Sequence, residues 1–326
     1  MDIQRMHMKA HTHCRGFSLV ELMVALVITL ILLAGIGQIF LSSKKSYTLQ
    51  DSLSRMQENG RYAMDTLSQD LRRAGYWGGN SDIAAIDGTL PRLAENGTCL
   101  GSGNTDWARM LDKKIFGLND NRTNYDCLPS TTLPPQDVLL VRFAAPWQVG
   151  GTTTPAFQND HFYLRSSLFE GKFFKGSDEA SNPITAAAVR TSELVARAYF
   201  INPATAAGTN KCGGGTVPSL FRLGLANGVP TIEEIAYGVE NLQVQYGLDT
   251  GPPANSVNSF VNAAGPTDPM WDQVIAVRIW LLIRSECPDT GYTNDTIYSM
   301  GGANLPAFND SYRRKLYTST IRLRNK

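Results

Sequence analysis

FSLVELMVALVITLILLAGIGQIFL, residues 17–41, is the stretch that decides the fold of this chain. It is apolar except for Ser18, Glu21, Thr29 and Gln38. As a helix that rises about 1.5 Å per residue, it would reach roughly 37 Å, which exceeds the ~30 Å hydrocarbon core of a bilayer. The sequence therefore predicts a transmembrane helix over 17–41.

The residues ahead of this stretch, 1–16, are polar and basic and include Arg5, Lys9 and Arg15. By the positive-inside rule, they keep the N-terminus in the cytoplasm and direct the rest of the chain across the membrane. A secretory signal peptide has a shorter apolar region followed by a small-x-small cleavage site, and this sequence has neither. We therefore expect a single-pass membrane protein, and any cleavage must come before the apolar run.

Glu21 is an ionisable residue inside the apolar stretch. A carboxylate there costs about 2.5–3.5 kcal/mol even on lenient insertion scales, so it needs either the nearby headgroups or a cation at the same depth. Cleavage after Gly16 would supply a cation, because the new α-amino group of Phe17 has an unperturbed pKa of about 7.7–8. One chain does not easily pair these two groups within itself. The pattern therefore indicates lateral assembly, with Glu21 of one chain meeting Phe17 of a neighbour.

The stretch RGFSLVEL, residues 15–22, resembles the class III leader of type IV prepilins and type II secretion pseudopilins, in which a prepilin peptidase cuts after the glycine. The resemblance implies that Gly16 ends the leader, that Phe17 becomes the methylated first residue and that Glu21 is the assembly glutamate. It also implies an inner-membrane location before incorporation into a pilus on the cell surface. The implied partners are prepilin peptidase, other minor pilins, a major pilin and inner-membrane lipid.

A second helical stretch follows, SYTLQDSLSRMQENGRYAMDTLSQDLRRAGYWGG, residues 46–79. Apolar or small residues recur in it every three or four positions, which places them on one helix face that would pack on the protein's own sheet. Gly75, Gly78 and Gly79 end the pattern. We expect one helix from 17 to 75, with 42–75 as its amphipathic half. The face consists of Leu49, Leu53, Met56, Gly60, Ala63, Leu67, Leu71 and Ala74.

Two further runs narrow the family. Residues 57–79, QENGRYAMDTLSQDLRRAGYWGG, are similar to PilW-type minor pilins of type IV pilus assembly, and residues 312–325 resemble the end of such chains. PilW-type pilins are the counterparts of the J-type pseudopilin of type II secretion. The resemblance implies a minor pilin that primes pilus assembly at or near the filament tip. A J-type pseudopilin and a pilus-borne module that binds DNA or surfaces remain alternatives.

The chain beyond the helix shows strand patterns without βαβ alternation. In residues 315–324, Tyr317, Ser319, Ile321 and Leu323 alternate with their neighbours as in a half-solvated antiparallel strand. Residues 80–135 are rich in Gly, Asn, Asp and Pro, which is typical of a long loop region. We expect an α+β domain over 76–326, with the helix on an antiparallel sheet. The expected strands are 137–144, 160–166, 194–201, 219–225, 240–247, 273–284 and 315–324.

The cysteines indicate disulfide bonds. Cys14 lies in the leader, whereas Cys99, Cys127, Cys212 and Cys287 lie in the part expected in the periplasm. An even number in an oxidising compartment predicts two disulfides, and the sequence has no CxxC pair that would favour zinc. Three pairings are possible. We favour Cys99 with Cys127 and Cys212 with Cys287, whose loops would contribute roughly 3.5 and 4.5 kcal/mol in the chain-entropy model.

Composition argues against an enzyme and against a nucleic-acid-binding protein. The 30 basic and 29 acidic residues give a net charge of +1, and removal of residues 1–16 leaves 27 basic and 28 acidic ones. Neither charge balance favours binding of the chain to a polyanion such as a nucleic acid. Of the four histidines, only His161 lies outside the leader, which excludes a His-rich metal site. No nucleotide-binding, metalloprotease or nucleophile-elbow motif is present. We expect no catalytic residue, no cofactor and no metal.

The sequence contains three weaker candidates for a functional site. Asp160 and His161 could form half of a catalytic pair but are more simply a solvated or structural pair. Residues 119–126 are rich in oxygen ligands, yet Arg122 stands where an EF-hand requires a ligand and no closing Glu follows. A basic C-terminal cluster could meet DNA, although a solvated strand face or a partner contact is the simpler interpretation. That cluster consists of Arg313, Arg314, Lys315, Arg322, Arg324 and Lys326.

Overall fold

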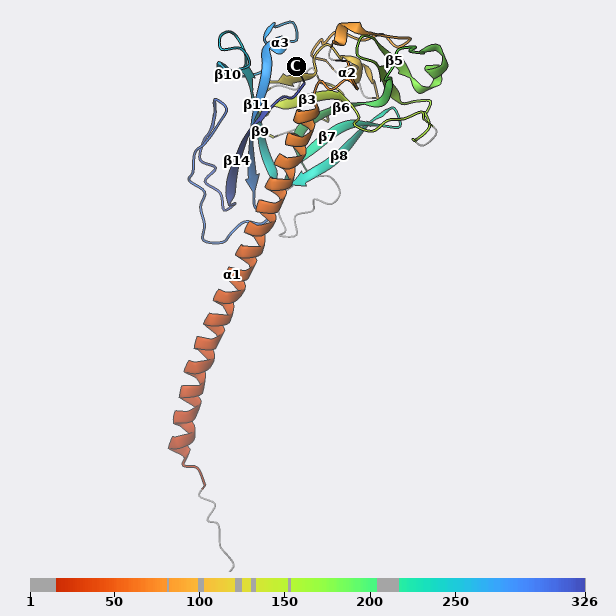
Figure 1. Ribbon diagram of the computed structural model, residues 1–326. Helices are drawn as coiled ribbons and strands as arrows, with labels where there is room; N and C mark the ends of the chain where they lie inside the picture. The colour runs from red at the N-terminus through yellow and green to blue at the C-terminus, as the bar shows by residue number, and fades with distance from the viewer. Residues whose placement is uncertain are drawn as a thin grey trace, which may run out of the picture. The chain divides into compact units, whose positions relative to one another are not determined.

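The computed structural model shows a long helix and a β-rich globular part (Figure 1). The chain forms two compact units, Met1–Asp51 and Ser52–Lys326. The helix α1 begins at Leu19 and ends at Arg73, so its expected extent is confirmed to within two residues at each end. The structure describes residues 16–80, 82–98, 103–120, 125–129, 133–151, 154–203 and 217–325.

In the first unit, α1 from Leu19 to Leu41 is apolar apart from Glu21, Thr29 and Gln38, and it is exposed on all sides. Its most apolar window of 18 residues has a mean hydropathy of 2.8, and none of that window is buried. Gly35 and Gly37 do not interrupt it. The hydroxyl of Thr29 donates to the carbonyl oxygen of Ala25 at 2.7 Å, which satisfies this polar group within the helix. By length and composition the segment can cross a membrane.

In the second unit, one face of α1 is buried, as its three- and four-residue spacing predicts. Met56, Ala63, Leu67, Leu71 and Ala74 all belong to the main hydrophobic core. Complete burial of a Leu side chain is worth about 1.5–3 kcal/mol, so this face alone anchors the helix firmly. The helix ends where predicted, because Gly75 adopts a positive φ of 74°, which side chains disfavour.

The larger sheet is built around the strand β6, whose neighbours along its length are β4, β3 and β7. The order is β1-β5-β4-β6-β3-β2, and β7 joins β6 to β8. All pairings are antiparallel except the two-residue pairing of β1 with β5. Its strands are β1 (Ile86–Asp87), β2 (Ile115–Leu118), β3 (Val138–Ala144), β4 (Phe162–Ser166), β5 (Gly171–Lys175), β6 (Arg190–Pro203), β7 (Pro218–Ala226) and β8 (Val229–Tyr237).

A second sheet has the order β10-β9-β11-β14 and is entirely antiparallel. The last strand of the chain, β14, lies at its edge and pairs with β11 from Arg314 to Arg322. The members are β9 (Val239–Leu248), β10 (Ser259–Val261), β11 (Val274–Arg284) and β14 (Arg314–Arg322), and a separate hairpin joins β12 (Tyr298–Met300) to β13 (Ala303–Leu305). Short helical turns are η1 (Ile83–Ala85), α2 (Asp106–Arg109), η2 (Gly176–Ser181) and α3 (Met270–Gln273).

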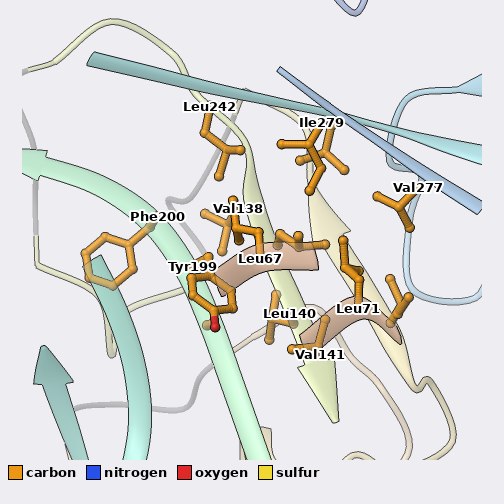
Figure 2. Packing of buried hydrophobic residues seen from close by; sticks show 14 of the residues in the cluster. Leu67, Leu71, Val138, Leu140, Val141, Tyr199, Phe200, Leu242, Val277 and Ile279 are labelled. Atoms are coloured by element: carbon orange, nitrogen blue, oxygen red, sulfur yellow. The ribbon is translucent and has the colours of Figure 1, made fainter. Parts of the chain in front are cut away.

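The helix and both sheets share one core. Figure 2 shows Leu67 and Leu71 of α1 surrounded by side chains from β3, β6, β9 and β11. The labelled partners include Leu140, Tyr199 and Ile279. The fold is therefore α+β, with the amphipathic half of α1 on antiparallel sheets, as the sequence predicts.

Each predicted strand is present, but the prediction was incomplete. The stretch 80–135, expected as loop, contains β1, α2 and the buried strand β2. The sequence patterns also missed β5, β8, β10, β12 and β13. Most of these strands are too short to show a clear apolar alternation. The longer β8 lacks one because it is a mostly exposed edge strand with Thr231, Glu233 and Glu234.

Candidate processing and assembly site

The N-terminal end of α1 presents an accessible junction. Gly16, Phe17 and Ser18 precede the helix, and all three are exposed. A Cβ atom added to Gly16 would have no heavy atom within 4 Å among the described residues. The fold of the chain itself therefore does not require glycine at this position.

Glu21 lies in the first turn of α1, where the sequence also provides a capping arrangement. The amide of Leu22 donates to the carbonyl oxygen of Ser18 at 3.1 Å, which makes Ser18 the residue that caps the helix. Ser18-x-x-Glu21 matches the capping-box pattern, and an acidic group in the first turn is favourable to the helix dipole. The sequence analysis missed this local role, although the four-residue pattern alone would have revealed it. The position of Glu21 thus suits a favourable interaction with the start of its own helix.

The residues around Glu21 leave it in an apolar environment. Phe17 is 83% exposed, and large apolar side chains are exposed all along the span rather than on one stripe. A helix that is apolar all round fits lipid or several neighbouring helices rather than a single packed face. Glu21 is the one charged side chain of residues 17–41.

A second carboxylate of α1, Asp70, is buried and was not predicted. Its two oxygens both lie 2.7 Å from Nη1 of Arg197, and the hydroxyl of Tyr199 also donates to it. Burial and the Asp70 charge raise the pKa of the Tyr199 hydroxyl above its usual value, so Tyr199 remains a neutral donor. Asp70 stands three residues after Leu67 and four before Ala74, so its position on the apolar face was the available signal. This cluster fixes α1 to β6.

Arg142 and Glu95 form a second, fully buried ion pair at 2.8 Å. Arg142 also donates to the carbonyl oxygen of Trp107 through Nε at 3.0 Å and to that of Lys113 at 2.8 Å. These contacts tie the segment that connects α1 to β3 onto Arg142 of β3.

The cysteines are only partly described. Cys127 and Cys287 are each disulfide-bonded. Cys99 and Cys212 lie outside the described residues. The predicted pairing therefore stays a prediction.

Asp160 and His161 each bind a different residue. Asp160 binds Nζ of Lys175 at 2.8 Å, which lowers the pKa of this carboxyl group. The Nδ1 atom of His161 instead lies 2.6 Å from Oε1 of Glu193. The structure does not bring Asp160 and His161 together as a catalytic dyad.

The oxygen-rich stretch 119–126 is described only in part, because residues 121–124 lie outside the described residues. Of its remaining carboxylates, Asp120 accepts a hydrogen bond from Nε2 of Gln243 at 3.1 Å. The described part therefore adds no argument for a calcium site.

The basic C-terminal cluster does not form one continuous cationic face. Arg313 donates to Asp289 at 2.6 and 2.8 Å, and Arg314 binds both Glu240 and Asp310. Lys326 lies outside the described residues. With its two adjacent arginines neutralised within the chain, the cluster is poorly suited to a nucleic acid backbone.

Known families match the two ends of the chain. A family model described as type IV pilus-assembly protein W matches residues 198–325, and a model of the prokaryotic N-terminal methylation motif matches residues 11–37. No curated protein matches the sequence. A type IV-like pilin from Thermus thermophilus is 13% identical, with 85% of this chain and 97% of that chain covered at a TM-score of 0.35. That structural likeness is too low to support further argument.

The two family models agree with the features already described at each end. The methylation motif spans the exposed Gly16 junction and the apolar start of α1, and the PilW match spans β7 to β14. The two matches together support a PilW-type minor pilin.

Proposed function

We propose that prepilin peptidase cuts this chain after Gly16 and that the mature protein, which begins at Phe17, helps to prime type IV pilus assembly at or near the filament tip. The observation that carries the proposal is Glu21, the one charged side chain of residues 17–41, a segment whose apolar side chains are exposed all round. It acts as a structural subunit rather than as an enzyme. Its partners are prepilin peptidase, other minor pilins and the major pilin.

The proposed topology follows from the distribution of charge around the span. Residues 1–16 form the leader, 17–41 lie in the inner membrane, 42–75 continue the helix, and 76–326 form the periplasmic domain. The domain carries disulfides, and the bonded states of Cys127 and Cys287 support this. In the assembled state the protein leaves the bilayer and becomes part of the pilus.

The assembly step depends on the charge of Glu21. In the apolar interior of a helix bundle, a carboxylate gains strongly from a charge-assisted contact with an ammonium group. The α-amino group of Phe17 of a neighbouring mature chain supplies that group. Methylation of the nitrogen preserves its charge, so the contact is retained in the modified chain.

Two variants at Glu21 separate this role from helix capping. Glu21→Gln keeps a side chain that fits the capping box but removes the charge, whereas Glu21→Val removes both. In a strain that lacks the native copy, we expect both variants to reach normal membrane levels, because an apolar or neutral residue inserts at least as well as Glu. We expect neither variant to enter filaments, as scored by surface pili and by the protein recovered in them.

Ser18→Ala is the matched control. It removes the hydroxyl that the capping-box pattern requires, at a cost of up to about 1 kcal/mol to the helix start, and leaves the charge in place. It should therefore still be incorporated. Normal incorporation of Glu21→Gln, with failure of Ser18→Ala, would assign Glu21 to capping and would refute the assembly role.

Processing is tested at the junction itself. The exposed Gly16 has no neighbour within 4 Å in the described residues, so Gly16→Leu leaves the fold intact. We expect this variant to keep residues 1–16 in cells with an active peptidase, whereas the native chain begins at Phe17. N-terminal sequencing of membrane-extracted protein distinguishes the two. A native chain that retains its leader would contradict the proposal.

A further inference from the structure

A groove of about 480 Å³ runs between α1 and the edge strand β14. The helix residues that line it recur every three or four positions between Gln57 and Arg72, which places them on one flank of α1. At about 1.5 Å per residue, this flank is roughly 22 Å long. The groove is lined by Gln57, Arg61, Met64, Asp65, Ser68, Arg72, Lys315 and Tyr317.

The groove carries positive charge that no ion pair of the described residues neutralises, although the Lys315 ammonium lies 5.3 Å from the centre of the Tyr317 ring. Arg61, Arg72 and Lys315 are exposed, and no acidic side chain within the described part of the chain pairs with any of them. The one carboxylate of the groove, Asp65, accepts a hydrogen bond from Gln69 at 2.8 Å. Elsewhere on the domain, arginines such as Arg314 are held by two carboxylates at once. The three groove cations are therefore available to an acidic partner.

One wall of the groove is an open sheet edge. Among the described residues, β14 pairs only with β11, so the backbone along its other edge has no strand beside it. Unpaired N–H and C=O groups on such an edge are a template for an added strand. Lys315 and Tyr317 stand on this strand two residues apart, so both side chains lie on the same sheet face. A strand added here would pass directly beside the cations.

The floor of the groove is apolar. Met64 and Tyr317 are partly buried there and pack against the main core. Gly60 makes this floor possible, because a Cβ at that position would meet Cε2 of Tyr317 at 2.6 Å. The absence of a side chain on Gly60 allows the Tyr317 ring to lie against the helix. The groove thus combines an apolar floor, a cationic rim and an open strand edge.

We propose that this groove receives an acidic, extended segment of a neighbouring pilin subunit, which adds to the free edge of β14. The inference rests on the proposed function as a pilin. The apolar floor accepts alternate apolar side chains of the incoming strand, and Arg61, Arg72 and Lys315 bind its carboxylates. The contact gives the subunit a second attachment, through its globular unit, besides the one at Glu21.

The charge density of the groove favours protein over nucleic acid. Duplex DNA carries one negative charge per about 1.7 Å, so roughly 22 Å of it presents about 13 charges. The groove opposes these charges with only three cations, and one of its other lining residues, Asp65, is itself acidic. Such a surface matches the few carboxylates of a protein strand and does not match a phosphate backbone.

The test uses the full chain in cells that make pili. A photoreactive amino acid replaces Ser68 in the groove, and a matched probe replaces Gln69, which lies outside the groove lining. We expect cross-links from position 68 to an acidic segment of another pilin, identified by mass spectrometry of the joined peptides. The joint change Arg61→Glu with Arg72→Glu should lower the yield at least tenfold.

Controls keep the result specific. Arg73→Glu makes the same charge change on the adjacent exposed residue outside the groove lining and should leave the yield unchanged. The joint change Arg61→Lys with Arg72→Lys keeps the charge and should retain most of the yield. Membrane level and protease resistance of each variant confirm that the fold persists. A yield that charge reversal does not lower, or cross-links to lipid or nucleic acid, would overturn the proposal.

A third probe in place of Leu26 separates this proposal from the one on which it rests. Pilin cross-links from position 26 without any from position 68 would leave the assembly role intact and refute the groove contact. The absence of pilin cross-links from both positions would refute the pilin assembly role and the groove contact together.

Discussion

Gly60 of α1 and Tyr317 of β14 lie in direct contact, so close that a Cβ at Gly60 would be 2.6 Å from one ring carbon and 2.8 Å from another. A glycine inside a helix costs about 1 kcal/mol relative to alanine. Here that cost is offset because the ring of the last strand packs against the bare helix backbone. The relationship joins the two ends of the described sequence and forms the floor of the groove.

Replacement of Gly60 by alanine tests this contact, because its effect on the free energy of unfolding should change sign when Tyr317 is removed. Gly60→Ala should lower the free energy of unfolding by about 1–2 kcal/mol, because overpacking outweighs the gain in helix propensity. In a Tyr317→Ala background the same change should stabilise the protein by up to about 1 kcal/mol, since only the propensity gain remains. Denaturant unfolding of the full chain in detergent measures both values. A stabilising effect in both backgrounds would show that the contact is absent.

Asp70 should be among the most sensitive polar residues of the domain. Asp70→Asn leaves Arg197 without its carboxylate in a largely buried site, and we expect a loss of about 3 kcal/mol. Asp65→Asn is the matched control on the same helix, since Asp65 is exposed and bonds only to Gln69 among the described residues. Its effect should stay within about 0.5 kcal/mol. Equal effects of the two substitutions in thermal or denaturant unfolding would contradict the role given to Asp70.

Asp137 predicts a pH dependence of stability. Burial raises the pKa of its carboxyl group to about 7, although the amides of Asp120 and Val244 donate to it and favour the charged form. The unfolded value is about 3.9, so between these two values the folded protein binds more protons than the unfolded one. The contribution of Asp137 is therefore fully present below about pH 4 and is lost as the pH rises to 7, by at most about 1.4 kcal/mol per pH unit.

The measurement is the free energy of unfolding across this pH window for the native chain and for Asp137→Asn. The variant should lack the decline that Asp137 contributes. Asp310→Asn is a suitable comparison, because Arg314 lowers the pKa of Asp310 and any contribution from that group falls below the window. A native chain whose slope equals that of Asp137→Asn would refute the assignment.

Thiol labelling tests the disulfides. Denatured, unreduced mature protein should react at none of Cys99, Cys127, Cys212 and Cys287, and stoichiometric labelling would contradict the prediction. Cys99→Ser distinguishes the pairings, because it should release the thiol of Cys127 alone if the nearest-neighbour pairing is correct. Release of Cys212 or Cys287 instead would establish one of the other pairings.

The sequence predicted the parts of the fold that depend on local periodicity. The bounds of α1 and the strand over 273–284 follow from runs of apolar residues whose spacing is visible along the chain. The bonds made by Asp70 and Arg142 could not be predicted, because their partners lie far away in sequence and a polar residue in an apolar pattern looks like an interruption. Asp70 is 127 residues from Arg197.

The candidate site was predicted almost entirely from a short motif. Gly16 and Phe17 directly precede an apolar helix and Glu21 lies in its first turn, so no tertiary information was needed to select them. The groove beside β14 is the opposite case. It depends on Lys315 and Tyr317 of the last strand coming to lie beside Arg61 and Arg72 of the helix, which no local pattern encodes.

The end of α1 receives its last hydrogen bonds from the end of the chain. The side-chain amide of Asn325 donates to the carbonyl oxygens of Arg73 and Ala74, which precede it by 252 and 251 residues. These two hydrogen bonds can therefore form only after residue 325 of this sequence has been synthesised. Contacts so far apart in sequence form slowly, and until β14 pairs with β11 that edge of β11 is unpaired and prone to aggregation.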